Sequence, residues 1–309
     1  KGKKRKLEQT KENKMGVMPV NKLLVTMSLP IVISMLIQAM YNLVDSVFVA
    51  QINPDALTAV GMAFPMQSLM IAFQTGLGVG MNALVSRYLG QKKPYEAGLA
   101  ATHALILTAL NYVIFLIVGL TAIPAFFSIQ THSEIIAGYG VEYLSIVCCG
   151  SLGLFFQIYG ERILQATGKT LLSMVSQILG AVINIVLDPV FIFVFGWGIK
   201  GAAWATVIGQ VVSGVLVIVY FWKFRNMYLT GAMLKPKMPY LKAIISLGLA
   251  SCINQIAMAI VQIVLNNILR HYGADSVYGS DIPIACVGVI SKVNQMLSLI
   301  HISEPTRPY

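Results

Sequence analysis

Residues 23–50 read LLVTMSLPIVISMLIQAMYNLVDSVFVA, and Asp45 is the single charged residue in this run. One helix needs roughly 20 apolar residues to cross a bilayer core about 30 Å thick. The run is long enough to do so with residues to spare. A helix that is apolar on nearly all sides also needs lipid or a large protein core around it. The stretch therefore predicts a membrane-spanning helix.

Similar apolar runs recur along the chain. They lie near residues 56–84, 97–117, 141–165, 171–195, 201–222, 244–269 and 284–297. The composition agrees, because 57% of the 309 residues are hydrophobic and 11% are charged, whereas soluble domains carry about 25% charged residues. The sequence predicts an all-α membrane protein with about eight spanning helices, the last of them shorter than the others.

The net charge of +10 follows membrane topology. Short cytoplasmic loops collect Lys and Arg, and here the basic residues cluster in the N-terminal tail and in every second connection. Those assigned to the cytoplasmic side are Lys22, Arg87, Lys92, Lys93, Arg162, Lys169, Lys223, Arg225, Lys235, Lys237 and Lys242, and the intervening loops hold Lys200 and Arg270. This alternation predicts a cytoplasmic N-terminus and a lipid bilayer, not a nucleic acid, as the partner of the basic residues.

The chain also contains a repeat. Ser246-Leu247-Gly248 parallels Ser28-Leu29-Pro30, and CVGVISKVNQML from Cys286 parallels AVGMAFPMQSLM from Ala59. The copies are six helices apart, so both run in the same direction across the membrane. We therefore expect two lobes related by a parallel repeat.

The predicted organisation has five parts. A basic cytoplasmic tail covers residues 1–14, although Met15 could be the natural start. A first lobe of six helices covers 15–222, a cytoplasmic linker with two prolines covers 223–241, and 242–296 begin a second lobe. Residues 297–309, LSLIHISEPTRPY, look like a translated sequencing adapter, with a natural polar tail as the alternative.

The first predicted helix carries a polar stripe. Gln38, Tyr41, Asn42 and Asp45 are spaced i, i+3, i+4 and i+7 and so lie on one helical face. Polar contacts between helices are the alternative to a functional site. Because such contacts rarely need a carboxylate, and a buried acid is costly, we favour a functional role for Asp45.

The fifth and sixth predicted helices add further oxygen donors. Asn184 and Asp188 are one turn apart, and Pro189 follows directly, which removes a backbone donor and predicts a bend at the acid. Thr206 and Gln210 are one turn apart at the start of the sixth helix. A capped structural acid, and a threonine bonded to its own helix, are the alternatives. Together these oxygens suit a proton or a hard monovalent cation.

Other features point away from enzymatic chemistry. The sequence contains no nucleotide-binding loop, Ser/His/Asp set or His-rich metal site, so we expect no enzyme activity, no cofactor and no resident metal. Gly76, Gly78 and Gly80 lie inside a spanning segment and favour close helix packing over phosphate binding. Glu142 and Glu161 lie near predicted helix ends, where we expect contact with headgroups or water.

Five motifs resemble those of one transporter family. They are SLP at Ser28, YNLVDSVFV at Tyr41, VSRYLGQKK at Val85, ILQATGK at Ile163 and NIVLDPVFIFVFGWGIKGAAWAT at Asn184. Jointly they resemble the multidrug and toxic compound extrusion (MATE) transporters, particularly the DinF-like branch, over residues 23–296. The resemblance implies twelve helices in two lobes of six and export of small organic, often cationic amphipathic compounds in exchange for inward H⁺ or Na⁺.

The resemblance also implies roles for individual residues. It places a cation-coupling site, which could bind Na⁺, at Asp45, Asn184, Asp188 and Thr206; a substrate cavity at Gln38, Tyr41 and Asn42; and helix kinks at Pro30 and Pro189. Helix seven lacks the intramembrane glutamate of the NorM-like branch, which favours coupling through the first lobe.

The implied protein is a multi-pass monomer of the plasma membrane. Two alternatives stay open: a lipid-linked oligosaccharide flippase of the same superfamily, which should have a basic cavity, and a membrane interaction or sensor protein that does not transport.

Overall fold

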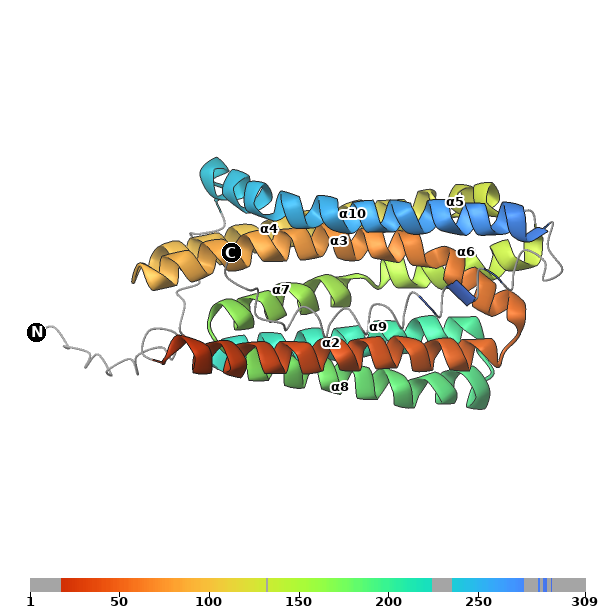
Figure 1. Ribbon diagram of the computed structural model, residues 1–309, viewed down its shortest axis with the longest axis horizontal. Coiled ribbons are helices and arrows are strands. Elements are labelled where there is room, and N and C mark those ends of the chain that lie inside the picture. The colour runs from red at the N-terminus through yellow and green to blue at the C-terminus, as the bar shows by residue number, and fades with distance from the viewer. Residues whose placement is uncertain are drawn as a thin grey trace, which may run out of the picture.

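The computed structural model describes residues 18–131, 133–223 and 235–274, together with 283, 286, 287 and 290. The described chain is built from helices (Figure 1). They are α2 (Val20–Ala50), α3 (Pro54–Gly90), α4 (Pro94–Thr121), α5 (Ile123–Gln130), α6 (Glu134–Cys149), α7 (Leu152–Ala166), α8 (Thr170–Pro189), the π-helical η1 (Val190–Val194), α9 (Ile199–Lys223) and α10 (Met238–Ala274).

Six of these segments are long and apolar enough to cross a membrane, namely α2, α3, α4, α8 with η1, α9 and α10. The pair α6 and α7 makes a seventh if the two are one span, bent by 48°. Six of the first seven predicted spans are thereby confirmed, and the predicted span at 141–165 corresponds to this bent pair. The predicted eighth span lies almost wholly outside the described residues, as do the N-terminal tail, the middle of the linker and residues 297–309.

The bend between α6 and α7 was not predicted, because the apolar run continues through it. Gly150 and Ser151 separate the two helices, and Gly/Ser pairs are a common cause of sharp helix kinks. The short helix α5 was not predicted either. Its Phe127 ring packs against α6 at Gly140, where an added Cβ would overlap the ring. A glycine on one helix therefore makes room for the other.

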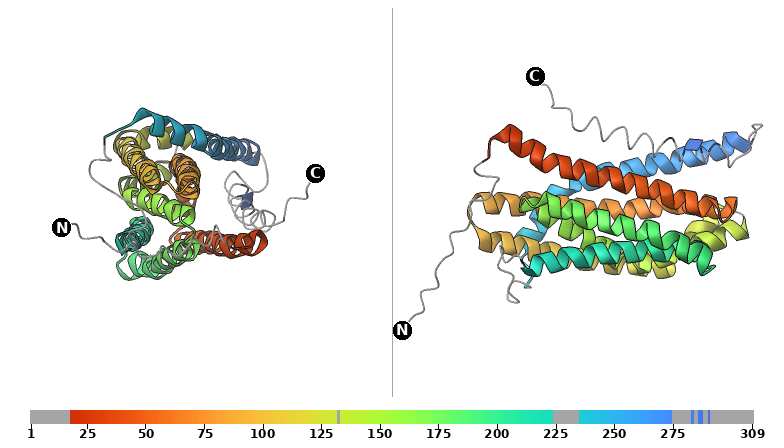
Figure 2. Two further views of the ribbon diagram at one scale, coloured as in Figure 1. Left: turned by 90° about the vertical axis from the view of Figure 1, so that its left-hand side faces the viewer. Right: turned by 90° about the horizontal axis from the view of Figure 1, so that it is seen from below.

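The helices form a bundle whose organisation is visible end-on in Figure 2. On one side α2 packs against α8, and α8 against α9; on the other side α3 packs against α4 and α10. Between the two groups lies α7, which contacts α3, α4, α8 and α9. A residue on α7 can therefore be buried even when it lies near the end of its helix.

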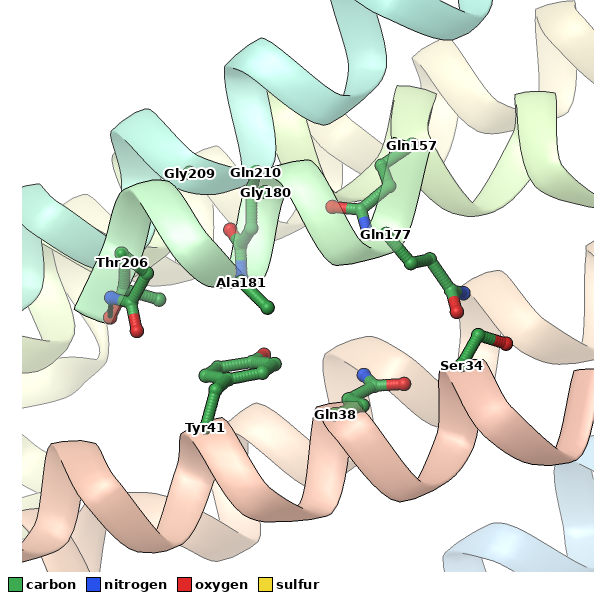
Figure 3. A pocket seen from close by; sticks show the side chains of 11 residues that line it. Ser34, Gln38, Tyr41, Gln157, Gln177, Gly180, Ala181, Thr206, Gly209 and Gln210 are labelled. Carbon is green, nitrogen blue, oxygen red and sulfur yellow. Dashed lines mark hydrogen bonds between the residues drawn. The ribbon is translucent and has the colours of Figure 1, made fainter. Parts of the chain in front are cut away.

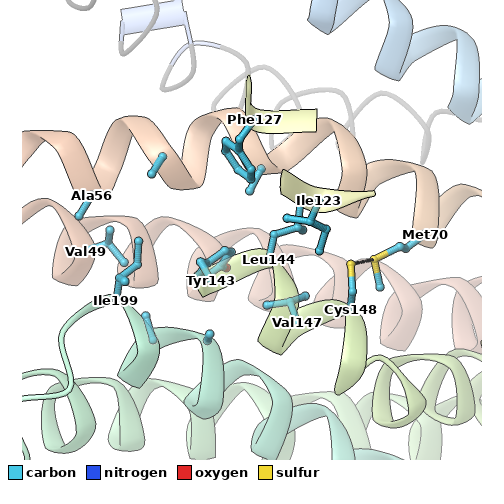
Figure 4. Packing of buried hydrophobic residues seen from close by; sticks show 14 of the residues in the cluster. Val49, Ala56, Met70, Ile123, Phe127, Tyr143, Leu144, Val147, Cys148 and Ile199 are labelled. Atoms are coloured by element: carbon cyan, nitrogen blue, oxygen red, sulfur yellow. Dashed lines mark hydrogen bonds between the residues drawn. The ribbon is translucent and has the colours of Figure 1, made fainter. Parts of the chain in front are cut away.

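The larger buried apolar cluster is centred on α3, α5 and α6 and also takes in residues of α2, α4, α7, η1 and α9 (Figure 4). Met70, Phe127 and Leu144 are fully buried in it, and the Cys148 thiol lies 3.5 Å from the Met70 sulfur. The cluster and the polar site described below share no residue.

Helix α10 packs against α3 by backbone contact. An added Cβ at Gly80 would overlap the Ile244 carbonyl, and one at Gly248 would overlap the Gly76 carbonyl. The prediction that these α3 glycines serve close packing is confirmed. The helix begins at Met238, earlier than the predicted residue 244, because Pro239 is tolerated in its first turn.

The start of α10 is also bound to α4. The Nε2 atom of His103 accepts a hydrogen bond from the Lys237 backbone N–H at 2.8 Å, while its Nδ1 atom lies 2.7 Å from the Leu99 carbonyl. The Tyr240 hydroxyl donates to Glu96, and its ring lies 5.3 Å from the His103 ring. These contacts tie the first turn of α10 to α4.

Candidate functional site

A polar pocket lies between α2, α7, α8 and α9 (Figure 3). Its lining residues are Ser34, Gln38, Tyr41, Gln157, Gln177, Gly180, Ala181, Asn184, Thr206, Gly209 and Gln210. The enclosed space is about 20 Å³, which is room for about one water molecule. Pockets for drug-sized ligands measure about 300–1,000 Å³. As it stands in the structure, the pocket fits a water molecule or a small cation.

Helical spacing explains why the lining is polar along its whole length. On α8, Gln177 and Asn184 are two turns apart, and on α9, Thr206 and Gln210 are one turn apart, so each helix turns one polar stripe inward. Figure 3 shows Tyr41 on α2 extending toward these two helices. The predicted polar face of α2 therefore meets polar faces of its neighbours.

The predicted residues of α8 and α9 come together at one end of this pocket. The Asn184 amide donates to Asp188 Oδ1 and to Thr206 Oγ1, both at 3.4 Å. Asp188 and Asn184 are buried, and Asp188 Oδ2 and Asn184 Oδ1 have no hydrogen-bond partner among the described residues. This end of the pocket thus holds buried acceptor oxygens that lack donors, an arrangement that is costly unless a donor or cation is bound.

Two glycines bring α8 and α9 close enough for these contacts. A Cβ added at Gly209 would lie 2.7 Å from the Gly180 carbonyl oxygen, and one at Gly180 would lie 2.9 Å from the Gly209 carbonyl oxygen. The helices therefore cross backbone to backbone. Asn184 and Thr206 lie about one turn from the crossing, where the gap between the helices is still small.

The first-helix acid faces the same region. Asp45 is 8% exposed, although it lies on a helix whose other faces are apolar, and α2 packs against α8. Asp45 and Asp188 are close enough to interact electrostatically. Gln38 and Tyr41 line this water-sized pocket, whereas Asn42 does not line it and is exposed. A substrate cavity at these three residues stays a prediction.

The two prolines behave differently. Regular α-helix ends at Pro189, and the next five residues form the π-helix η1, in which the Phe195 N–H donates to the Val190 carbonyl at 2.9 Å. The helix type thus changes two residues after Asp188, at the place where the sequence predicts a bend. By contrast, α2 continues as one helix through the buried Pro30, and a bend there stays a prediction.

The third acid of this region, Glu161, was not predicted as a site residue. Glu161 is 6% exposed, so the expectation that it contacts headgroups or water is wrong. It is buried because α7 lies in the middle of the bundle. The i, i+4 pair of Gln157 and Glu161 was the available signal. Glu142 does lie at the surface, where it forms a 3.1 Å ion pair with Lys200.

Comparisons with known proteins agree on one family. The family model described as MatE matches residues 30–190. The multidrug export protein MepA of Staphylococcus aureus strain MRSA252 is 27% identical over 290 residues, which are 91% of this chain and 61% of that protein.

Solved structures give the same result. The outward-facing structure of a multidrug resistance MATE family transporter of the MOP superfamily superposes with a TM-score of 0.81 at 30% identity, covering 90% of this chain and 61% of that one. A MOP superfamily transporter from Pyrococcus furiosus, reported with a binding pocket of reversed polarity that suggests a different function, has the same values. The chain thus spans about three fifths of the length of these proteins.

Proposed function

The chain belongs to the MATE family, and from this premise we propose that the whole protein exports small organic, cationic amphipathic compounds in exchange for inward H⁺ or Na⁺. The relatives of known function include multidrug export proteins, which supports a drug-like substrate. The branch within the family stays a prediction. So do a plasma-membrane location, a cytoplasmic N-terminus and a monomeric state.

One observation carries the cation-coupling part of this proposal. Asp45 and Asp188 are both buried within electrostatic reach of each other. Two carboxylates so placed cannot both stay ionised without a compensating positive charge. Asn184 and Thr206 add neutral oxygens beside Asp188, and oxygen donors suit both H⁺ and Na⁺.

The pocket is large enough for the cation but too small for the organic substrate. About 20 Å³ is too small for a drug-sized compound. We therefore place the substrate between the two lobes and the cation within the first. Binding of the cation at the acids opposes substrate occupancy, and the lobes rock to alternate access. An inside-negative potential adds about 2.3 kcal/mol per charge per 100 mV to inward cation movement.

The flippase alternative stays open. A lipid-linked oligosaccharide carries phosphate and needs cationic partners in the cavity between the lobes, and the water-sized pocket of the first lobe does not test this. A sensor or interaction protein that does not transport would show no substrate flux in proteoliposomes that contain the purified full-length protein.

The direct test replaces each acid with its isosteric amide. Cells that express the full-length protein with Asp45→Asn or Asp188→Asn are assayed for efflux of a fluorescent organic cation under a defined H⁺ or Na⁺ gradient. We expect gradient-driven efflux to be lost in both variants. Glu142→Gln, which changes an exposed acid of the same lobe, is the matched control. Undiminished, still gradient-dependent efflux in both Asp variants contradicts the proposal.

A further inference from the structure

A second acidic end lies beside the pocket, where α7 packs against α8, and Glu161 itself does not line the pocket. The Glu161 carboxylate accepts hydrogen bonds from the Gln157 amide at 2.9 Å and from the Gln177 amide. Glu161 is buried, and both glutamines line the pocket that Asn184 and Thr206 line at its other end. The mechanism proposed above makes no use of these three residues.

Besides Asn184 Oδ1, three further amide oxygens of residues that line the pocket lack donors. Because the amide nitrogens of Gln157 and Gln177 point to Glu161, their oxygens point elsewhere, and Gln157 Oε1 and Gln177 Oε1 are buried without a hydrogen-bond partner among the described residues. The Oε1 atom of Gln210, on α9, is likewise buried without a hydrogen-bond partner among the described residues. Buried acceptors without donors are costly. A proton, a cation or a cation-bound water would give these acceptor oxygens the positively charged partner that they lack.

The second acidic end is separate from the first. Gln177 and Asn184 are seven residues apart on α8, which corresponds to roughly 10 Å along the helix axis. No hydrogen bond spans that distance. Tyr41, on α2, lies between the two ends and within electrostatic range of Asp45, Glu161 and Asp188. The water-sized space beside it is lined by Gln157 and Gln177 and also by Asn184 and Thr206.

The local charges leave the negative charge of Glu161 only partly compensated. Arg162 is the neighbouring charged group that acts on Glu161. However, its Nη1 atom donates to Gln165 Oε1 at 3.3 Å, and no ion pair links it to Glu161 among the described contacts. On α8, the neutral Gln177 amide donates a hydrogen bond to Glu161. On α2, Tyr41 lies within electrostatic range of Glu161. Glu161 is therefore a buried acid held by neutral donors.

We propose that Glu161, Gln157 and Gln177 form a second station for the coupling cation, on the side of the pocket predicted to face the cytoplasm. The cation moves from Asp45 and Asp188 past Tyr41 to Glu161 before it leaves the lobe. A proton binds the Glu161 carboxylate directly. A sodium ion takes the carboxylate and the oxygens of the two amides, which rotate to face it. This inference rests on the proposed cation-coupled transport.

The test measures how efflux depends on the cation. Full-length protein in proteoliposomes is assayed for efflux of an organic cation over a range of pH at constant Na⁺ and over a range of Na⁺ at constant pH. We expect Glu161→Gln, which removes the charged ligand, to raise the cation concentration for half-maximal efflux by about tenfold, equivalent to about 1.4 kcal/mol of binding free energy. Efflux that changes with pH at constant Na⁺ identifies H⁺ as the coupling ion, and efflux that changes with Na⁺ at constant pH identifies Na⁺. Gln177→Leu, which keeps the acid, should shift the same curve less.

Controls separate this inference from the function on which it rests. Glu142→Gln should leave the curve unchanged, and thermal melting of each purified variant shows whether it is folded. If Glu161→Gln does not fold, Glu161→Asp and Gln177→Leu provide the same comparison. A folded Glu161→Gln protein with wild-type cation dependence overturns the second station. Unchanged cation dependence in Asp45→Asn and Asp188→Asn overturns the proposed function instead.

Discussion

The glycine crossing of α8 and α9 yields a quantitative prediction, because it sets the distance between Asn184 and Thr206. In Gly209→Ala, the new Cβ would lie 2.7 Å from the Gly180 carbonyl oxygen, and ordinary contact begins at 3.4 Å. The helices must therefore separate locally by about 0.7 Å. The Asn184–Thr206 hydrogen bond, already 3.4 Å long, would lengthen to about 4 Å and be lost.

Two measurable effects should follow from this separation. Overpacking of this kind costs typically about 1–3 kcal/mol, so the midpoint of thermal unfolding of the purified full-length protein should fall. Loss of the hydrogen bond should also raise the cation concentration required for half-maximal efflux. Gly61→Ala is the matched control, because a Cβ added at Gly61, also within a helix, meets no atom within 4 Å. It should leave both quantities near their wild-type values.

A double-mutant cycle decides whether the effect on efflux passes through Thr206. Thr206→Val removes the hydroxyl with little change in volume. If Gly209→Ala acts by breaking the Asn184–Thr206 bond, adding Thr206→Val to it should change the cation dependence little further, because the bond is already gone. Fully additive effects of the two substitutions, or a Gly209→Ala protein with wild-type stability and cation dependence, would refute this reasoning.

Two further predictions concern buried polar residues of α3 and α4, which do not line the polar pocket. Gln74 is fully buried and donates to Thr108 Oγ1 at 3.0 Å and to the Phe155 carbonyl at 3.1 Å. Gln74→Leu should lower the free energy of unfolding by about 1–3 kcal/mol, because it leaves these acceptors unsatisfied. The measurement is a lower melting midpoint without a change in cation dependence. His103→Phe keeps a ring beside Tyr240 but removes the acceptor for the Lys237 N–H, so hydrogen exchange at this amide should accelerate, and unchanged protection would contradict the assigned contact.

Much of the fold follows from local sequence. Seven apolar runs predict seven spans, because the length and polarity of a segment alone determine whether it can cross a bilayer. The first lobe's acids were predictable for the same reason: Asp45 and Asp188 interrupt runs in which an ionisable group is costly. The pairing of Asn184 with Asp188 follows from helical spacing.

Only the tertiary structure decided which of the polar residues meet. The bend at Gly150 and Ser151, the helix α5 and the burial of Glu161 all depend on neighbours that are distant in sequence. Glu161 near the end of its own helix looks accessible in the sequence, yet four other helices surround α7. The sequence thus determined that the chain crosses the membrane and carries buried acids, because those properties are local. The structure decided that a third acid is buried beside the pocket, hydrogen-bonded to two residues that line it, because burial depends on packing.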